Sequence, residues 1–177
     1  EETLEELMQN ELVPFIKGIE NHVDSIMIGH LAVPALNEGK NTSATLSKNV
    51  IENLLRKQLG YDGLIISDAL NMHSVSKLYE TKGQLEWEAF NAGNDVLCFA
   101  ENISEGIQAI LNNATPERIE ESFNRLWKCK QKTGILEGNI APQGVFDYEA
   151  TSILNRLIAD KSTTKIKDNN SSLHLFE

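Results

Sequence analysis

The feature that most constrains the fold is a short apolar run at residues 63–66, which leads through Ser67 directly into Asp68. An apolar run of this length, bounded by turn residues, is typical of a strand buried on both faces of a parallel sheet. Ligands of α/β sheets and barrels bind at the carboxyl ends of the strands, so Asp68 is a candidate for chemistry. Asp also caps helices routinely, and spacing alone leaves a capping role for Asp68 equally open.

The same arrangement occurs three times along the chain. Asp24, Asp62 and Asp95 each precede an apolar run. Six residues after each Asp comes a polar side chain, respectively His30, Asp68 and Glu101. If the three runs are parallel strands that begin in step, these polar side chains share one rim of the sheet. Short apolar runs often have acidic neighbours, so chance also explains the pattern.

Helical patterns separate the runs, as the crossovers between parallel strands require. Ser47 is the predicted N-cap of a helix that Gly60 ends. Further helices are predicted at residues 4–16, where Pro14 kinks the helix or starts its second half, and over residues 84–92, from 104 and over 116–134. The apolar residues of three of these helices, the one after Ser47, the one from 104 and the one over 116–134, are predicted to be core: Ile51, Leu54, Leu55, Leu59, Ile107, Ile110, Leu111, Ile119, Phe123, Leu126 and Trp127.

The character of the chain changes after Gly134. Gly138, Pro142 and Gly144 lie in a polar stretch that is typical of a linker. Beyond it, residues 148–161 have a helical pattern and residues 162–167 are a candidate strand. The predicted boundaries are therefore a first unit at 1–136, a linker at 137–148 and a further segment at 149–177.

Composition narrows the function classes. The net charge of −10 argues against a nucleic-acid partner, and no apolar run reaches the length of a membrane span. Cys98 and Cys129 have no zinc-site spacing and no support for a disulfide, which leaves the redox compartment open. No metal or other cofactor is expected. Without an initial Met or a signal-like start, the chain is expected to be a mature product or a piece of something longer.

Four segments together resemble glycoside hydrolase family 3: Leu-Val-Pro-Phe at 12–15, Ser-Ile-Met-Ile-Gly-His at 25–30, the stretch 55–72 containing Ile-Ser-Asp-Ala-Leu-Asn-Met, and Ala-Gly-Asn-Asp-Val-Leu at 92–97. The match runs through Leu136, and residues 153–175 resemble the start of that family's second domain. The resemblance implies an α/β fold. The expected fold is the C-terminal portion, about three β/α units, of a TIM-type barrel at 1–136. A short linker and a partial second-domain segment are expected to follow it.

The resemblance also implies roles for individual residues. Asp68 corresponds to the family's catalytic nucleophile, which forms a covalent glycosyl intermediate in a retaining mechanism. His30 corresponds to a residue that lines the sugar pocket, and Met72 either walls that pocket or packs under Asp68. Asn94 and Asp95 are expected to be structural. The family's acid/base group, an Asp-His pair near a Lys-His-x-Pro-Gly motif or a Glu of the second domain, is absent here, so the isolated chain is expected to be inactive.

The residue after the nucleophile separates two branches of this family. The β-glucosidase branch usually has Trp there, whereas Ala69-Leu70-Asn71-Met72 matches the β-N-acetylglucosaminidase (β-hexosaminidase) branch. The implied activity is removal of terminal β-linked N-acetylhexosamine from glycans, chitin or cell-wall fragments. A β-glucosidase and a non-catalytic carbohydrate-binding fragment are the alternatives. A phosphate-receiver domain fits poorly, because Met72 is one place too far from Asp68 and His73 replaces the expected Pro.

Because the matched strands are the sixth to eighth of an eight-stranded barrel, the resemblance implies unpaired apolar edges. The expected partners are a carbohydrate substrate and either the missing N-terminal barrel half or another copy of this chain. Relatives with the Asp-Ala-Leu-Asn-Met form suggest a periplasmic or secreted parent, although cytoplasmic members of the branch exist.

Overall fold

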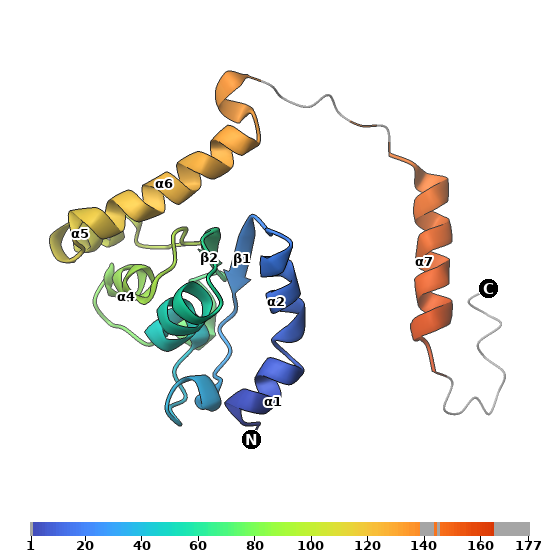
Figure 1. The fold of residues 1–177 in the computed structure, drawn as a ribbon. Coiled ribbons are helices and arrows are strands. Elements are labelled where there is room, and N and C mark those ends of the chain that lie inside the picture. The colour runs from blue at the N-terminus through green and yellow to red at the C-terminus, as the bar shows by residue number, and fades with distance from the viewer. Residues whose placement is uncertain (1, 139–143, 145, 165–177) are drawn as a thin grey trace. The chain divides into compact units, whose positions relative to one another are not determined.

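The computed structural model describes residues 2–138, 144 and 146–164. They belong to two compact units, Glu1–Asn139 and Ile140–Glu177, which are described separately. In the first unit helical segments separate strands β1 and β2, as expected for an α/β crossover, and further helices follow β2 (Figure 1). Its elements are α1 (Leu4–Gln9), α2 (Val13–Glu20), β1 (Ser25–Ile28), η1 (Pro34–Leu36), η2 (Ala44–Leu46), η3 (Asn49–Gln58), β2 (Leu64–Ser67), α3 (His73–Ser76), α4 (Gln84–Ala92), α5 (Ile103–Asn113), α6 (Pro116–Lys132) and η4 (Ile135–Glu137).

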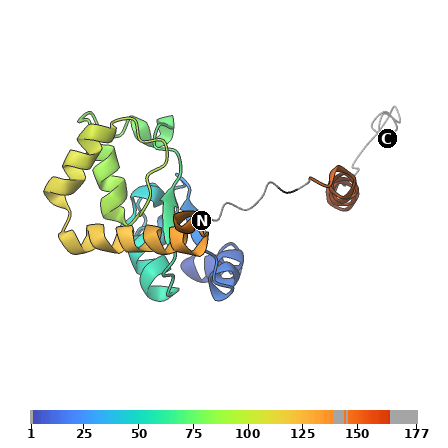
Figure 2. The same ribbon diagram turned by 90° about the horizontal axis from the view of Figure 1, so that it is seen from above.

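The strands β1 and β2 pair in parallel, with Ser25 opposite Leu64 and Ile28 opposite Ser67. Helices α1 and α2 lie on the β1 side of this pair and α4 and α5 on the β2 side, as Figures 1 and 2 show. The register differs from the prediction that the strands begin in step, because Asp24 lies opposite Gly63 rather than Asp62. His30 is therefore one place out of step with Asp68, and a one-residue offset reverses the face of a strand residue.

The predicted third strand after Asp95 is wrong for the described structure. Only an isolated parallel bridge joins Val96 to Ile66, although the Leu70 N–H still donates to the Cys98 carbonyl at 2.9 Å. The Cys98 N–H donates to the Ser67 hydroxyl at 3.0 Å instead of to a backbone carbonyl. Phe99 then takes a positive φ of 46°. A side-chain acceptor followed by left-handed backbone interrupts the ladder after one bridge.

The main core lies between the strands and η3, which is wound as a π-helix. As predicted, the Ser47 hydroxyl caps this helix by accepting the Val50 N–H at 3.2 Å. Gly93 passes close to η3 with φ +122°, and a Cβ there would clash with an Ile51 methyl. The buried core residues are Ile26, Ile28, Ala44, Val50, Ile51, Leu55, Tyr61, Ile65 and Ala92.

The predicted core faces of α5 and α6 are only partly buried in the described structure, where Ile110, Ile119 and Leu126 are half-buried. On α5, Ile107 and Leu111 are exposed; on α6, Phe123 and Trp127 are exposed by 54% and 41% and stack on each other at 5.7 Å. Both helices form where predicted, and Pro14 lies at the start of α2 as expected. A helix with an apolar stripe needs a facing layer, and the described two-stranded sheet is too narrow to supply one.

The Asp95 side chain is fully buried and joins three arginines. One oxygen, Oδ2, accepts from Arg56 at 2.7 Å and from the Ile65 N–H at 3.0 Å. The other, Oδ1, accepts from Arg125 at 3.0 Å and from the Ser122 hydroxyl at 2.6 Å, and lies 3.5 Å from Arg118. These contacts tie α6 and η3 to the start of β2 and agree with the structural role predicted for Asp95.

Tyr61 precedes β2 and donates its hydroxyl to the Leu64 carbonyl at 3.1 Å. Burial raises the pKa of this phenol from 10.0 to about 12, against the opposing effect of the Arg56 guanidinium. Because the folded-state pKa is raised, the stabilisation from the neutral phenol is complete below about pH 10 and is lost as the pH rises towards 12. We expect the unfolding free energy to fall across this window, and to fall less in Tyr61→Phe.

Urea unfolding at a series of pH values between 9 and about 12 measures this difference, since the denaturant midpoint reports stability. Tyr148→Phe is the matched control, because Tyr148 is exposed. Parallel pH curves for the wild type and Tyr61→Phe would contradict the assignment.

The second unit contains α7 (Tyr148–Ser162), which begins where the Asp147 carboxylate accepts the Ala150 N–H at 2.9 Å. This confirms the predicted helix and extends it by one residue. The candidate strand at 162–167 is wrong at Ser162, which is helical, and residues 165–167 lie outside the described part. Among the described helices, none combines the length and apolarity needed to cross a membrane.

Candidate active site

Asp68 follows β2 directly, at the carboxyl end of the strand. Its N–H donates to the Ile28 carbonyl at 2.9 Å, which extends the parallel ladder one residue beyond β2. The half-buried carboxylate accepts the Ala69 N–H at Oδ1, at 2.8 Å. Within the described residues no hydrogen bond or ion pair reaches Oδ2. The capping alternative is disfavoured, because the next helix, α3, begins only after Met72 and receives no bond from Asp68.

His30 follows β1 and reaches the loop after β2 with its imidazole ring. Its Nε2 lies 2.9 Å from the Ala69 carbonyl oxygen, and its Nδ1 lies 2.8 Å from the Thr45 hydroxyl. Continued beyond the strands, the parallel register places His30 opposite Ala69, the residue that follows Asp68, and this contact agrees with it. Both ring nitrogens are engaged within the chain.

Met72 closes the same loop. Its N–H donates to the Ala69 carbonyl at 3.1 Å, and its backbone begins α3. The Met72 side chain is 45% exposed, so it is available to form part of a wall. The carbonyl of Ala69 thus accepts two hydrogen bonds, one from His30 and one from Met72.

Glu101 does not join His30 and Asp68, and the predicted three-residue rim is wrong in this respect. Glu101 borders a small recess whose lining includes Leu70, Tyr79 and Glu86. No hydrogen bond or ion pair of the described residues links it to either candidate. The interrupted third strand explains this, because backbone beyond Phe99 no longer follows the strand direction.

Sequence reasoning missed Thr45, which is fully buried between the two predicted site segments. Besides its contact with His30, its hydroxyl lies 3.0 Å from the Ile28 carbonyl and 3.1 Å from the Gly29 carbonyl. Thr45 lies in a polar stretch without periodicity, so no sequence signal marks it. Its importance comes from hydrogen bonds to residues that are distant in sequence.

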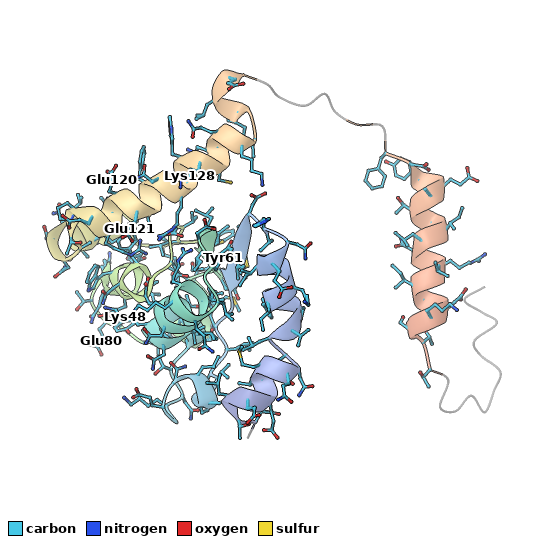
Figure 3. The ribbon with its side chains drawn as sticks, in the orientation of Figure 1. Lys48, Tyr61, Glu80, Glu120, Glu121 and Lys128 are labelled. Carbon is cyan, nitrogen blue, oxygen red and sulfur yellow. The ribbon has the colours of Figure 1, made fainter. Side chains whose placement is uncertain are left out.

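A cavity of about 450 Å³ lies at the opposite end of the strands from Asp68. It is lined by Asp24, Tyr61 and Asp62, which precede the strands, and by residues of α2 and α6 that include Lys128. Figure 3 shows Tyr61 and Lys128 together at this end, while Lys48, which precedes η3, lies towards the other. In barrels the amino ends of the strands serve stability and the carboxyl ends carry the chemistry, so this cavity does not displace Asp68 as the candidate.

The described residues contain no group of three or more His, Cys, Asp or Glu side chains arranged to hold a metal ion.

Comparison with known proteins decides the family. The family described as "Glycosyl hydrolase family 3 N terminal domain" matches residues 1–129. The chain belongs to glycosyl hydrolase family 3. The predicted family and the partial α/β barrel are thereby confirmed, and the loop after β2 is placed within a known enzyme scaffold.

Individual relatives carry related names. A "Beta-N-acetylglucosaminidase/beta-glucosidase" of Cellulomonas fimi is 26% identical over 176 residues, covering 88% of this chain and 30% of the relative. A "Beta-hexosaminidase" of Xanthomonas oryzae pv. oryzae (strain MAFF 311018) is 33% identical over 109 residues, covering 60% of this chain and 31% of the relative.

Solved structures agree on the fold. A family 3 β-N-acetylglucosaminidase from Paenibacillus sp. str. FPU-7 superposes with a TM-score of 0.74 at 32% identity, covering 91% of this chain and 32% of that one. The β-glucoside phosphorylase BglX superposes with a TM-score of 0.76 at 22% identity, covering 97% and 34%, and shows the fold alone. The chain thus spans about a third of the length of the relatives it matches.

Proposed function

We propose that this chain supplies the nucleophile portion of a retaining β-N-acetylhexosaminidase, with Asp68 as the nucleophile. The observation that carries the proposal is the position of Asp68 at the carboxyl end of β2, with Oδ1 held by the Ala69 N–H and Oδ2 without a partner among the described residues. A carboxylate that is fixed through one oxygen and open at the other suits attack on an anomeric carbon.

In the proposed reaction an Asp68 oxygen bonds to the anomeric carbon as the bond from that carbon to the glycosidic oxygen breaks. The departing oxygen takes a proton from a general acid. Water, deprotonated by the same group, then attacks the anomeric carbon and releases Asp68. His30 and Met72 border the proposed sugar site from the two loops that meet at Ala69. We place the acid/base group outside this chain.

The loop sequence supports the acetylhexosaminidase branch. Leu70 is buried in a cluster with Val75, Leu85 and Ala89. This cluster anchors the loop after β2 to the residues of α3 and α4. Ala69 between Asp68 and Leu70 leaves less bulk beside the nucleophile than a Trp would, and so leaves room for an N-acetyl group. The relatives named as β-hexosaminidases support an N-acetylhexosaminide substrate. The name of the Cellulomonas fimi relative also includes β-glucosidase, so a glucoside is the alternative substrate.

We further propose that additional barrel strands complete the site, from the same polypeptide or from another chain. In the described sheet β1 pairs only with β2, and Met27 of β1 is exposed by 58%. An unpaired edge with apolar side chains is normally covered in a native protein. The coverage of about a third of each relative supports the same view.

One assay tests both proposals. The complete gene product is expected to hydrolyse nitrophenyl β-N-acetylglucosaminide with a kcat/KM at least about tenfold above that for the β-glucoside, because a site that bonds the N-acetyl group discriminates against its absence. The isolated chain is expected to show no turnover. Preference for the glucoside would favour the β-glucosidase alternative, binding without turnover by the complete product would favour a carbohydrate-binding role, and turnover by the isolated chain would contradict the need for further strands.

A further inference from the structure

The carbonyl oxygen of Ala69 accepts two hydrogen bonds that hold the loop carrying Asp68. It accepts one hydrogen bond from the Met72 N–H at 3.1 Å and one from His30 Nε2 at 2.9 Å. A carbonyl oxygen can only accept, so Nε2 must carry a proton for this contact to be a hydrogen bond. The proton on Nε2 therefore decides whether His30 clamps the loop.

Thr45 lies on the other side of the ring, with its hydroxyl 2.8 Å from Nδ1. When the imidazole is neutral with its proton on Nε2, the Thr45 hydroxyl donates to Nδ1. When the ring is doubly protonated, the hydroxyl accepts from Nδ1 and turns its own proton to the Ile28 or Gly29 carbonyl, at 3.0 and 3.1 Å. In both states Nε2 keeps its proton, and the clamp on Ala69 persists.

Asn94 in turn holds the backbone of Thr45. The fully buried Asn94 side chain donates through Nδ2 to the Thr45 carbonyl at 2.9 Å and to the Ala89 carbonyl of α4 at 2.7 Å. A continuous series of hydrogen bonds thus runs from α4 through Asn94, Thr45 and His30 to the loop after β2. Groups held in this way restrict their neighbours to a narrow range of positions.

We propose that Thr45 is a positioning residue for the nucleophile, which acts by holding His30 with its proton on Nε2 and thereby fixing the loop of Asp68. This inference rests on the proposed function of Asp68. Removing the hydroxyl leaves Nδ1 of the half-buried ring without its partner, and the ring loses the orientation that clamps Ala69. A displacement of the nucleophile by about 1 Å is enough to cost about 100-fold in rate.

The test compares Thr45→Val, which keeps the shape, with Thr45→Ser, which keeps the hydroxyl, in the complete gene product. We expect Thr45→Val to lower kcat by about 10- to 100-fold with KM changed less than about threefold, and Thr45→Ser to stay within about threefold of the wild type. Long-range ¹H–¹⁵N correlation spectra are expected to show His30 protonated on Nε2 in the wild type and in Thr45→Ser, and a mixture of tautomers in Thr45→Val.

Unchanged kcat and tautomer in Thr45→Val would overturn the inference. If that variant does not fold, the wild-type spectrum decides alone, because a neutral ring with its proton on Nδ1 would also overturn it. The spectra report the clamp without reference to catalysis, and replacement of Asp68 by Asn reports the nucleophile without reference to Thr45. Failure of one proposal is therefore distinguishable from failure of the other.

Discussion

Replacing Asp68 with Asn in the complete gene product is expected to lower kcat for an aryl β-N-acetylglucosaminide by about 10⁴-fold or more, as loss of a covalent nucleophile typically does. The amide keeps the size of the side chain and can still accept the Ala69 N–H at 2.8 Å. It carries no negative charge and cannot form the glycosyl ester. The folded structure should therefore survive while turnover is lost, as steady-state kinetics and circular dichroism can establish together.

Asp62→Asn is the matched control for this experiment. Asp62 lies six residues earlier, before β2, and lines the cavity at the amino end of the strands. Because that end of a barrel serves stability rather than chemistry, kcat is expected to stay within about threefold of the wild type. Equal losses in the two variants, or an Asp68→Asn enzyme within about tenfold of the wild type, would place the nucleophile elsewhere.

Replacing Asp95 with Asn is expected to destabilise the first unit by about 3–5 kcal/mol, the usual cost of removing one partner from a buried ion pair. The Asp95 side chain is fully buried against Arg56, Arg118 and Arg125, whose side chains are 9–22% exposed. Burial already lowers the pKa of Arg56, and the negative charge of Asp95 opposes that effect. Without this charge, three guanidinium groups face one another around a neutral amide.

Urea unfolding followed by the fluorescence of Trp87 and Trp127, which both lie in the first unit, measures this loss. Asp24→Asn is the control, because Asp24 forms an exposed ion pair with Lys132 at 2.5 Å. Exposed pairs contribute about 0–1 kcal/mol. A change below about 1 kcal/mol in Asp95→Asn, equal to that of the control, would show that the arginines do not depend on this carboxylate.

Local features of the fold could be predicted from the sequence. The cap at Ser47, the Pro at the start of α6 and the apolar run before Asp68 each act within a few residues, so composition and spacing predict them. Strand register is different, because it depends on which backbone groups of two distant segments meet. The repeated six-residue spacing predicted His30 and Asp68 in step, whereas the pairing offsets them by one residue.

The rest of the candidate site depends on contacts between segments that are distant in sequence. His30 meets Ala69 across 39 residues, and Asn94 meets Thr45 across 49. No periodicity encodes such pairs, and Thr45 was missed for this reason. The exposed stripe of α6 shows the opposite case: the pattern of Phe123 and Trp127 correctly predicts an amphipathic helix, but it cannot predict which layer covers it.

Asp68 is tested as the nucleophile by incubating the complete gene product with a fluorinated N-acetylglucosaminide that traps the glycosyl intermediate, and then mapping its peptides by mass spectrometry. We expect one sugar adduct, on Asp68, and none in Asp68→Asn. An adduct on a different carboxylate, or turnover of the reagent without any adduct on Asp68, would contradict the claim that Asp68 is the nucleophile.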